Sequence, residues 1–562
     1  MAVVLPSDVW YIILGFLKAE RDYNTIFQCA VSSHILTEPA ITVLYQLYDT
    51  SPVTGGGPED EQFKSRRTAV SLASARSEQD AVVRKWALMW RSIILSTFDK
   101  TYLPYYSYIR ELDLTDLTNL ISDSRFTGKI RDEFFSGELG DYAFRDQAEY
   151  ELKGNKRLRS SKSSIDTAAI GERLGAAIVK KATAVRELSG NVSPSSLSEW
   201  VRGLAQLQAL SLWSGNALSQ QAEVEIKAHC PEFRKLTLFR WMDSPTDKAE
   251  LTCERFLNGL RPHSLEYFEV ISLSQLGPRS IKAFGSHLDS LTELKLTSLQ
   301  IDAIAELPSL TSPPALRVLA LTDSAPALRD EKFYSIVRDV AEWMCSCKNL
   351  RLLALRRFLD DPALLSQALS DDRLRLTKLS VEGYTMQTSR AFHEALASQT
   401  SLQSLYLQGD SSEFPDDQAI LVQALGQLSN LRELELKDIS ENFTPDHVIT
   451  LTPYLPQLER LWISGHDFDD EVWNAFLALP KLRVLIIHAL SDFTAEGILD
   501  FISQLGPGNR GLHLSILNAL SDANITEEAQ TVIGETLAQN LGGTFDFGLA
   551  QEEYTDSESE ED

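Results

Sequence analysis

Two cysteines separated by one residue, Cys345 and Cys347, are the first pair in this sequence whose spacing could support chemistry. A C-x-C pair supplies two thiolate ligands, whereas a structural zinc site needs four. No second cysteine pair and no histidine at ligand spacing accompanies it. The five cysteines are unevenly spread, which indicates no disulfide framework and favours a reducing intracellular compartment, cytoplasmic or nuclear. We expect no metal site.

Three glycines, Gly506, Gly508 and Gly511, match the G-x-G-x-x-G spacing of dinucleotide-binding loops. Such a loop follows a strand and opens a helix, because its backbone amides hold a pyrophosphate at the helix N-terminus. Here a helical pattern over 498–505 comes first and a strand-like segment, 512–514, follows. The order is reversed, so we expect a turn between two elements and no cofactor.

Other signatures of catalysis are also missing. None of the nine histidines belongs to a recognisable nucleophile–base arrangement, and there is no phosphate-binding loop or zinc signature. The net charge of −26 repels phosphates and argues against nucleic-acid binding. No apolar run approaches the roughly 18 residues that a membrane span requires. The sequence therefore predicts a binding protein, not an enzyme.

The elements that would present a binding surface follow from one recurring spacing, L-x-x-L-x-L. In the segment 431–437, Leu434 and Leu436 alternate with Glu433, Glu435 and Lys437, which predicts a strand with one buried and one open face. Stretches with helical spacing lie between such segments, for example over 420–425. One such strand cannot be stable alone, so its repetition matters.

The spacing recurs twelve times at a mean step of about 27 residues, which lies within the period of leucine-rich repeats. It begins at Val185, Leu207, Phe233, Leu265, Leu291, Leu316, Leu350, Leu376, Leu402, Leu431, Leu458 and Leu482. Stacked repeats would form an α/β solenoid with a parallel sheet on the concave face and helices outside. A helical repeat array would need paired helical patterns, which the segments 353–355 and 485–487 do not fit.

Residues 5–48 precede the repeats and show three short helical patterns. Val9, Ile12, Ile13, Phe16 and Leu17 recur at the spacing of one helix face, and Pro6 suits the start of that helix. Further patterns cover 23–31 and 33–48, the last interrupted by a proline at position 39. Three small helices bury little surface alone, so we expect this unit to bind a partner.

The segments LPSDVWYIILGFL and CAVSSHILTEPAITVLYQLYD resemble the F-box of fungal proteins that carry leucine-rich repeats. The resemblance implies docking to the Skp adaptor of an SCF-type cullin-RING ubiquitin ligase, with no catalytic residue in this chain. The residues that it implies for adaptor binding are Leu5, Pro6, Val9, Ile13, Leu14, Phe16 and Leu17. The alternative is that these helices only cap the solenoid.

Composition and the resemblance together divide the chain. We predict an F-box over 1–50, a flexible linker over 51–78, a leucine-rich-repeat domain over 79–550 and an acidic disordered tail over 551–562. The segment 109–114 would be the first strand, and an insertion near 118–168 separates it from the next. Within that insertion, a basic run over 153–162 suits a solvated loop or, alternatively, a nuclear localisation signal.

Residues that alternate with the buried leucines would face the concavity and could bind a protein substrate. Aromatic and arginine side chains dominate the energetics of protein interfaces, which favours those on these strands. The predicted set is Trp213, Phe239, Tyr267, Arg356, Tyr406, Glu433, Glu435, Lys437, Arg460, Trp462 and His488.

The function predicted from these features is substrate recognition within an SCF-type ubiquitin ligase. The F-box would bind the Skp adaptor, the adaptor would join the cullin scaffold, and the repeats would hold the substrate. Two alternatives remain: a leucine-rich-repeat scaffold, and a Ran-type GTPase-activating protein, since such activators combine these repeats with an acidic tail.

Overall fold

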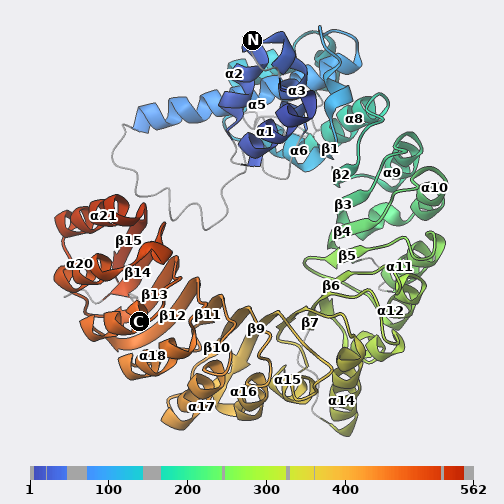
Figure 1. Cartoon of the computed structure of the whole chain (residues 1–562). Coiled ribbons are helices and arrows are strands. Elements are labelled where there is room, and N and C mark those ends of the chain that lie inside the picture. Colours follow the sequence, from blue (N-terminus) through green and yellow to red (C-terminus); the bar gives the residue numbers. More distant parts are fainter. Residues whose placement is uncertain are drawn as a thin grey trace, which may run out of the picture. The chain divides into compact units, whose positions relative to one another are not determined.

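The computed structural model describes residues 5–19, 22–46, 72–143, 166–242, 247–323, 330–359, 361–519 and 525–549. They belong to two compact units, Met1–Gln275 and Leu276–Asp562. Each unit contains parallel strands that follow one another in chain order (Figure 1). Residues 51–71 of the linker predicted over 51–78, the basic run over 153–162 and the acidic tail over 551–562 lie outside the described residues.

The first unit begins with helices and continues into five parallel strands. Its helices are α1 (Ser7–Ala19), α2 (Tyr23–Ser32), α3 (His34–Leu44), α5 (Leu72–Thr97), α6 (Leu114–Ser122), α7 (Gly128–Phe134), α8 (Thr167–Val179), α9 (Pro194–Trp200), α10 (Ala222–His229) and α11 (Asp247–Gly259). Its strands are β1 (Glu111–Asp113), β2 (Glu187–Gly190), β3 (Ala209–Ser214), β4 (Lys235–Arg240) and β5 (Tyr267–Val270). From β2 onward, a helix separates each strand from the next.

The second unit repeats the same alternation. Its strands are β6 (Glu293–Leu299), β7 (Val318–Asp323), β8 (Leu352–Arg356), β9 (Lys378–Thr385), β10 (Ser404–Asp410), β11 (Glu433–Lys437), β12 (Arg460–Phe468), β13 (Val484–Ser491), β14 (His513–Ala519) and β15 (Thr544–Leu549). Its helices are α12 (Pro278–Ala283), α13 (Ile301–Ile304), α14 (Glu331–Ser346), α15 (Asp361–Leu369), α16 (Arg390–Leu396), α17 (Pro415–Leu425), α18 (Pro445–Leu451), α19 (Trp473–Leu477), α20 (Ala495–Gln504) and α21 (Glu527–Leu541). In Figure 1 the strands of this unit line its inner side and the helices its outer side.

The leucine pattern explains this arrangement. Leu434 pairs in register with Leu405 on one side and Leu461 on the other, so equivalent leucines stack from repeat to repeat. Leu431, Leu434 and Leu436 are fully buried between the strand and helix layers. Burying each such side chain contributes about 1.5–3 kcal/mol. Each of the twelve predicted starts precedes a strand by two residues, which confirms the α/β solenoid and its parallel sheet.

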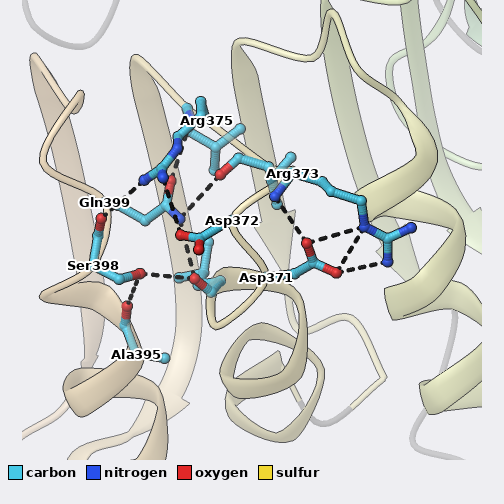
Figure 2. Close-up of polar contacts among 10 residues, drawn as sticks. Asp371, Asp372, Arg373, Arg375, Ala395, Ser398 and Gln399 are labelled. Atoms are coloured by element: carbon cyan, nitrogen blue, oxygen red, sulfur yellow. Dashed lines mark hydrogen bonds and ion pairs between the residues drawn. The ribbon is translucent and has the colours of Figure 1, made fainter.

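A buried polar side chain joins one repeat to its predecessor. In Figure 2, Gln399 follows α16 and reaches back to the turn before β9. Its Nε2 donates to the carbonyls of Leu369 and Leu374 at 3.1 and 3.2 Å, and its Oε1 accepts from the amide of Leu376 at 3.3 Å. These backbone groups lie at the end of α15 and in the segment before β9, where neither helix nor sheet supplies their partners, so the side chain supplies them.

Two other repeats use the same position with different residues. Asn509 donates from Nδ2 to the carbonyls of Leu479 and Leu482, at 3.2 and 2.9 Å. Cys230 lies 3.4 Å from the carbonyls of Val201 and Leu204. The turn predicted around Gly506 and Gly508 is the 3₁₀ turn Pro507–Asn509. It connects α20 to β14 and ends at this asparagine.

The N-terminal helices form a small core of their own. Leu14, Ile26, Ala30, Ala40 and Val43 are buried together, with Leu17 and Leu44 packed against them. α1 and α2 agree with the sequence prediction. The sequence predicted that Pro39 interrupts the third helix. Instead, α3 continues through Pro39, which is buried.

Helix α5 attaches these helices to the first repeat. The indole nitrogens of Trp86 and Trp90 both donate to Oδ2 of the buried Asp116, at 2.6 and 2.8 Å. On the other side, the ring of Tyr45 stacks on Tyr105 with centroids 4.5 Å apart, and its hydroxyl lies 3.0 Å from Oγ of Ser92. Helix α5 begins at Leu72, so the helical region starts before the predicted end of the linker at residue 78.

The predicted insertion between β1 and β2 is partly helical. Residues 118–143 complete α6 and contain α7 and a 3₁₀ segment, Gly137–Tyr142, and α8 begins at Thr167. Phe126 and Phe134 pack edge to face with their ring centroids 5.3 Å apart, and both are buried. The insertion therefore has its own small apolar cluster beside α5.

Candidate functional site

The first candidate surface is the exposed apolar face of α1–α3. It consists of Ile12, Ile13, Phe16, Phe27, Val31 and Ile35, whose exposed fractions range from 38% to 68%. The pairs Ile12–Phe16 and Phe27–Val31 each lie four residues apart, on one side of α1 and one side of α2. Large apolar side chains exposed together on a small unit are typical of a protein-binding site.

The structure divides the predicted adaptor-binding residues into two groups. Pro6, Ile13 and Phe16 are exposed, and Leu5 and Val9 are half-buried. Leu14 is only 1% exposed, and Leu17 packs against the same core. Both leucines therefore support the α1–α3 fold from inside. Leu14 offers almost no area to a partner, and Leu17 is half-buried. Sequence reasoning missed Phe27, Val31 and Ile35, although the i, i+4 spacing of the first two could have identified them.

The α1–α3 unit has a fixed attachment to the repeats through Tyr45. Burial and the neighbouring Tyr105 raise the pKa of Tyr45 to about 12, so its hydroxyl stays protonated and can hydrogen-bond to Ser92. Lys18 of α1 also donates to Oε1 of Gln46 at 3.4 Å, just after α3. A partner bound to α1–α3 would therefore be held at one place relative to the first strands.

The second candidate surface is the row of solvent-facing side chains on β9 to β12, on the face of the sheet opposite the helices. Register places Tyr406, Glu435 and Trp462 side by side, with Lys437 one step along β11. The Lys437 ammonium lies 4.0 Å from the Trp462 ring centroid and 5.1 Å from that of Tyr406. Both distances are within the range of a cation–π interaction. Tyr406, Lys437 and Trp462 together are called the aromatic sandwich below.

Ion pairs fix the carboxylates around this sandwich. Glu435 lies 2.8 Å from Nε of Arg460 and 3.5 Å from the Lys437 ammonium. One repeat earlier, Arg356 pairs with Glu382 at 3.1 Å. Glu433 accepts from the Ser404 hydroxyl at 2.8 Å. The acidic, lysine and arginine side chains predicted to bind a substrate are therefore already paired with neighbouring side chains in the free protein.

The tyrosine of the sandwich has an unusual environment. Burial raises the pKa of Tyr406 to about 12, and the nearby carboxylates of Glu382, Glu435 and Asp438 act in the same direction. Its hydroxyl donates to Oε1 of Gln408 at 2.8 Å, and Nε2 of Gln408 donates to Asp438 at 3.0 Å. The tyrosine is therefore neutral and held by hydrogen bonds. Glu382, Gln408 and Asp438 were not among the predicted residues, although the first two occupy equivalent outward positions.

The third candidate surface lies on β3 and β4 of the first unit. The rings of Trp213 and Phe239 stack with centroids 4.2 Å apart and an interplanar angle of 12°. They are 43% and 36% exposed, so two large aromatic faces meet the solvent together. Tyr267 is half-buried, and its hydroxyl donates to Glu269 on the same strand.

The predicted substrate-binding residues thus fall into two sets. Trp213, Phe239 and Tyr267 lie in the first unit, and the other eight lie in the second. Within the second set, His488 is exposed on β13, and Glu441 is an electrostatic neighbour of it. The structure brings five of the eight into one network of direct contacts, namely Tyr406, Glu435, Lys437, Arg460 and Trp462. Glu433 instead contacts Ser404 and Lys378, and Arg356 pairs with Glu382.

The cysteine pair lies in the core of the second unit, at the end of α14. Cys345 and Cys347 are buried, and burial raises their pKa to about 11 and about 12. In the described ranges, no cluster of three or more histidine, cysteine or acidic residues could hold a metal ion. The same residues include no helix long and apolar enough to cross a membrane.

No protein-family model matches the chain, and no curated protein matches it. Among solved structures, the crystal structure of the Rad7 and Elc1 complex in yeast is similar to it, at 17% sequence identity and a TM-score of 0.37. That match covers 54% of this chain and 76% of the other.

Proposed function

We propose that this protein is the substrate-recognition subunit of an SCF-type cullin-RING ubiquitin ligase. Helices α1–α3 bind an Skp adaptor, the adaptor joins the cullin scaffold, and the repeats hold a protein substrate. The chain itself transfers no ubiquitin and needs no cofactor. Its contribution is to hold the substrate near the catalytic subunits, which raises the effective concentration of substrate lysines there.

The observation that carries the proposal is the exposed apolar face of α1–α3. A helical unit that served only to cover the end of the solenoid would expose polar side chains. Here Phe16 is 68% exposed and Val31 is 63% exposed, while a separate set of residues makes the internal core. The face is thus additional to what the fold of these helices requires, and its apolar character suits a stable protein partner. The resemblance of residues 5–48 to an F-box supports an Skp adaptor as that partner.

The test is co-purification of the full chain with the adaptor and cullin. Phe16→Asp places a charge at the most exposed residue of the apolar face and should reduce adaptor binding at least a hundredfold, a loss of about 3 kcal/mol. Tyr102→Asp is the matched control, because Tyr102 is 98% exposed and lies in the same unit but outside α1–α3. The circular dichroism spectrum should be the same for both variants.

Two outcomes would contradict the proposal. Adaptor binding that survives Phe16→Asp would show that this face is not the docking site. A wild-type chain that binds no adaptor at all would instead favour the scaffold alternative. A ubiquitination assay with the reconstituted complex then tests the final step, since the chain without the other subunits should show no transfer.

A further inference from the structure

The stacked aromatic pair Trp213–Phe239 belongs to a larger exposed apolar patch. The backbone ladder continues past β5, where the amide of Ile271 bonds to the carbonyl of Leu238 at 2.9 Å. This places Ile271 beside Phe239, as Trp213 lies beside it on β3. Ile271 and Leu273 are 50% and 51% exposed. The four residues Trp213, Phe239, Ile271 and Leu273 are called the apolar strip below.

The strip has a rigid base. Trp241 is buried beneath it, and its backbone exchanges hydrogen bonds with Leu273 and Gln275, both at 2.8 Å. The ring of Trp241 lies against Gly215, where even a Cβ atom would come within 2.5 Å of the ring. The segment after β5 is therefore fixed to the segment after β4. A rigid surface loses little conformational entropy when a partner binds, which favours affinity.

Of the two strands that carry the aromatic pair, β4 is basic and β3 is uncharged. Lys235 and Arg240 are exposed on β4, Arg234 precedes them, and the sequences of β3 and β4 contain no acidic residue. Nη2 of Arg234 donates to Oε1 of Gln208 at 3.1 Å, whereas its buried Nε has no hydrogen-bond partner within the described residues. In a chain of net charge −26, this local excess of positive charge is a distinct feature.

Acidic neighbours limit the basic area to β4 and the residue before it. Glu187 lies on β2, and Glu266 and Glu269 lie at β5. Glu269 already accepts a hydrogen bond from Tyr267. The positive charge therefore lies along β4, where Arg240 directly follows Phe239 and Lys235 lies four residues before it. Glu269 pairs in register with Thr237, between Lys235 and Phe239, which restricts where a charged partner can be accommodated.

We propose that the apolar strip binds an acidic segment of a substrate that carries a bulky apolar side chain. The apolar side chain lies on Trp213 and Phe239, and the flanking carboxylates face Lys235, Arg240 and Arg234. This proposal rests on the proposed role of the repeats as the substrate-holding part. It assigns the substrate class to the first unit, whereas the aromatic sandwich of the second unit is already filled by Lys437.

A random twelve-residue peptide library, displayed on phage and selected on the immobilised full chain, tests the substrate class. We expect enrichment of peptides that combine several Asp or Glu with Leu, Ile, Met, Phe or Trp. The absence of any enrichment would overturn the proposal, and so would enriched peptides that are basic or lack a bulky apolar residue.

The site is then tested with the strongest selected peptide, labelled for fluorescence anisotropy. Trp213→Ala should weaken binding roughly 30-fold, equivalent to about 2 kcal/mol. Lys235→Glu should weaken it less at high salt than at low salt, since the attraction is screened. Val224→Ala is the control, because Val224 is 52% exposed on α10 in the same unit. Equal affinity for wild type and Trp213→Ala would overturn the assignment.

The two proposals fail in different ways. Trp213→Ala and Lys235→Glu should retain adaptor binding, because neither residue belongs to α1–α3. If no peptide is selected but adaptor binding is intact, only the proposed substrate class is contradicted. Peptide selection without adaptor binding would leave the strip as a binding site and remove the ubiquitin-ligase role.

Discussion

The ammonium of Lys437 lies 4.0 Å from the centre of the Trp462 ring, between that ring and Tyr406. Its side chain is only 24% exposed, and Glu435 lies 3.5 Å away. A lysine in this position connects β10, β11 and β12 across the outward face of the sheet. The interaction should therefore contribute to the stability of the second unit.

Replacing Lys437 with methionine keeps most of the side chain's volume but removes its charge. We expect the free energy of unfolding to fall by about 1 kcal/mol, the usual size of a partly buried cation–π interaction. Chemical denaturation, monitored by tryptophan fluorescence, measures this free energy of unfolding. Lys437→Arg keeps a cation between the rings and should cost less than half as much. Equal losses for the two variants would show that packing, not charge, accounts for the contact.

Gln399 offers a second test, at the junction between repeats shown in Figure 2. It is 1% exposed, and its amide bonds to three backbone groups of the preceding turn. Gln399→Ala leaves two carbonyls and one amide without this partner, so we expect a loss of about 2–3 kcal/mol. Gln427→Ala is the matched control on an exposed position and should change stability by less than about 0.5 kcal/mol. A small loss at Gln399 would mean that water replaces the amide.

Sequence reasoning located the strands because their signal is simple. Leu431, Leu434 and Leu436 must all be buried, and a period of two separates them from the open face. The same alternation identifies which residues face outward on each strand. It does not predict that Lys437 lies between two rings, because that depends on side-chain rotamers and on the register between neighbouring repeats.

The N-terminal helices show where sequence reasoning could not separate buried from exposed residues. Helix α1 has apolar residues on most of its circumference, including Ile12, Ile13, Leu14 and Phe16. The helical spacing alone cannot decide which of them faces the core of α1–α3. Leu14 is buried and Ile12 is 59% exposed, and only the packing of α2 and α3 determines this.

The cysteines provide a third prediction. Cys230, Cys253, Cys345 and Cys347 are buried, and only Cys29 is partly accessible. Burial raises the pKa of Cys230 and Cys347 to about 12, so neither forms a thiolate at neutral pH. A chromogenic disulfide reagent should therefore modify one thiol in the native protein and five after denaturation. Cys29→Ser should abolish the rapid native reaction, and a remaining fast thiol would contradict the buried positions.

His393 makes the stability of the second unit sensitive to acid. It is fully buried beside Phe392, and its Nε2 lies 3.4 Å from the Tyr384 hydroxyl. Burial lowers its pKa to about 4, although Asp417 acts in the opposite direction. The unfolded chain therefore binds a proton near pH 6.5, whereas the folded chain remains neutral until about pH 4. Between these values, stability must fall as the pH falls.

From pH 7 to pH 5, this histidine should lower the free energy of unfolding by about 2 kcal/mol, since each pH unit within the window costs about 1.4 kcal/mol. Glutamine cannot take up the proton. Between pH 7 and pH 5, the free energy of unfolding of His393→Gln should therefore fall by about 2 kcal/mol less than that of the wild type, whatever the stability of the variant at pH 7. His466→Gln is the control, because His466 is exposed on β12 and should leave the pH dependence unchanged. Urea unfolding at both pH values measures the difference. Parallel pH profiles for wild type and His393→Gln would show that the imidazole becomes protonated in the folded protein as readily as in the unfolded chain, which its burial beside Tyr384 and Phe392 opposes.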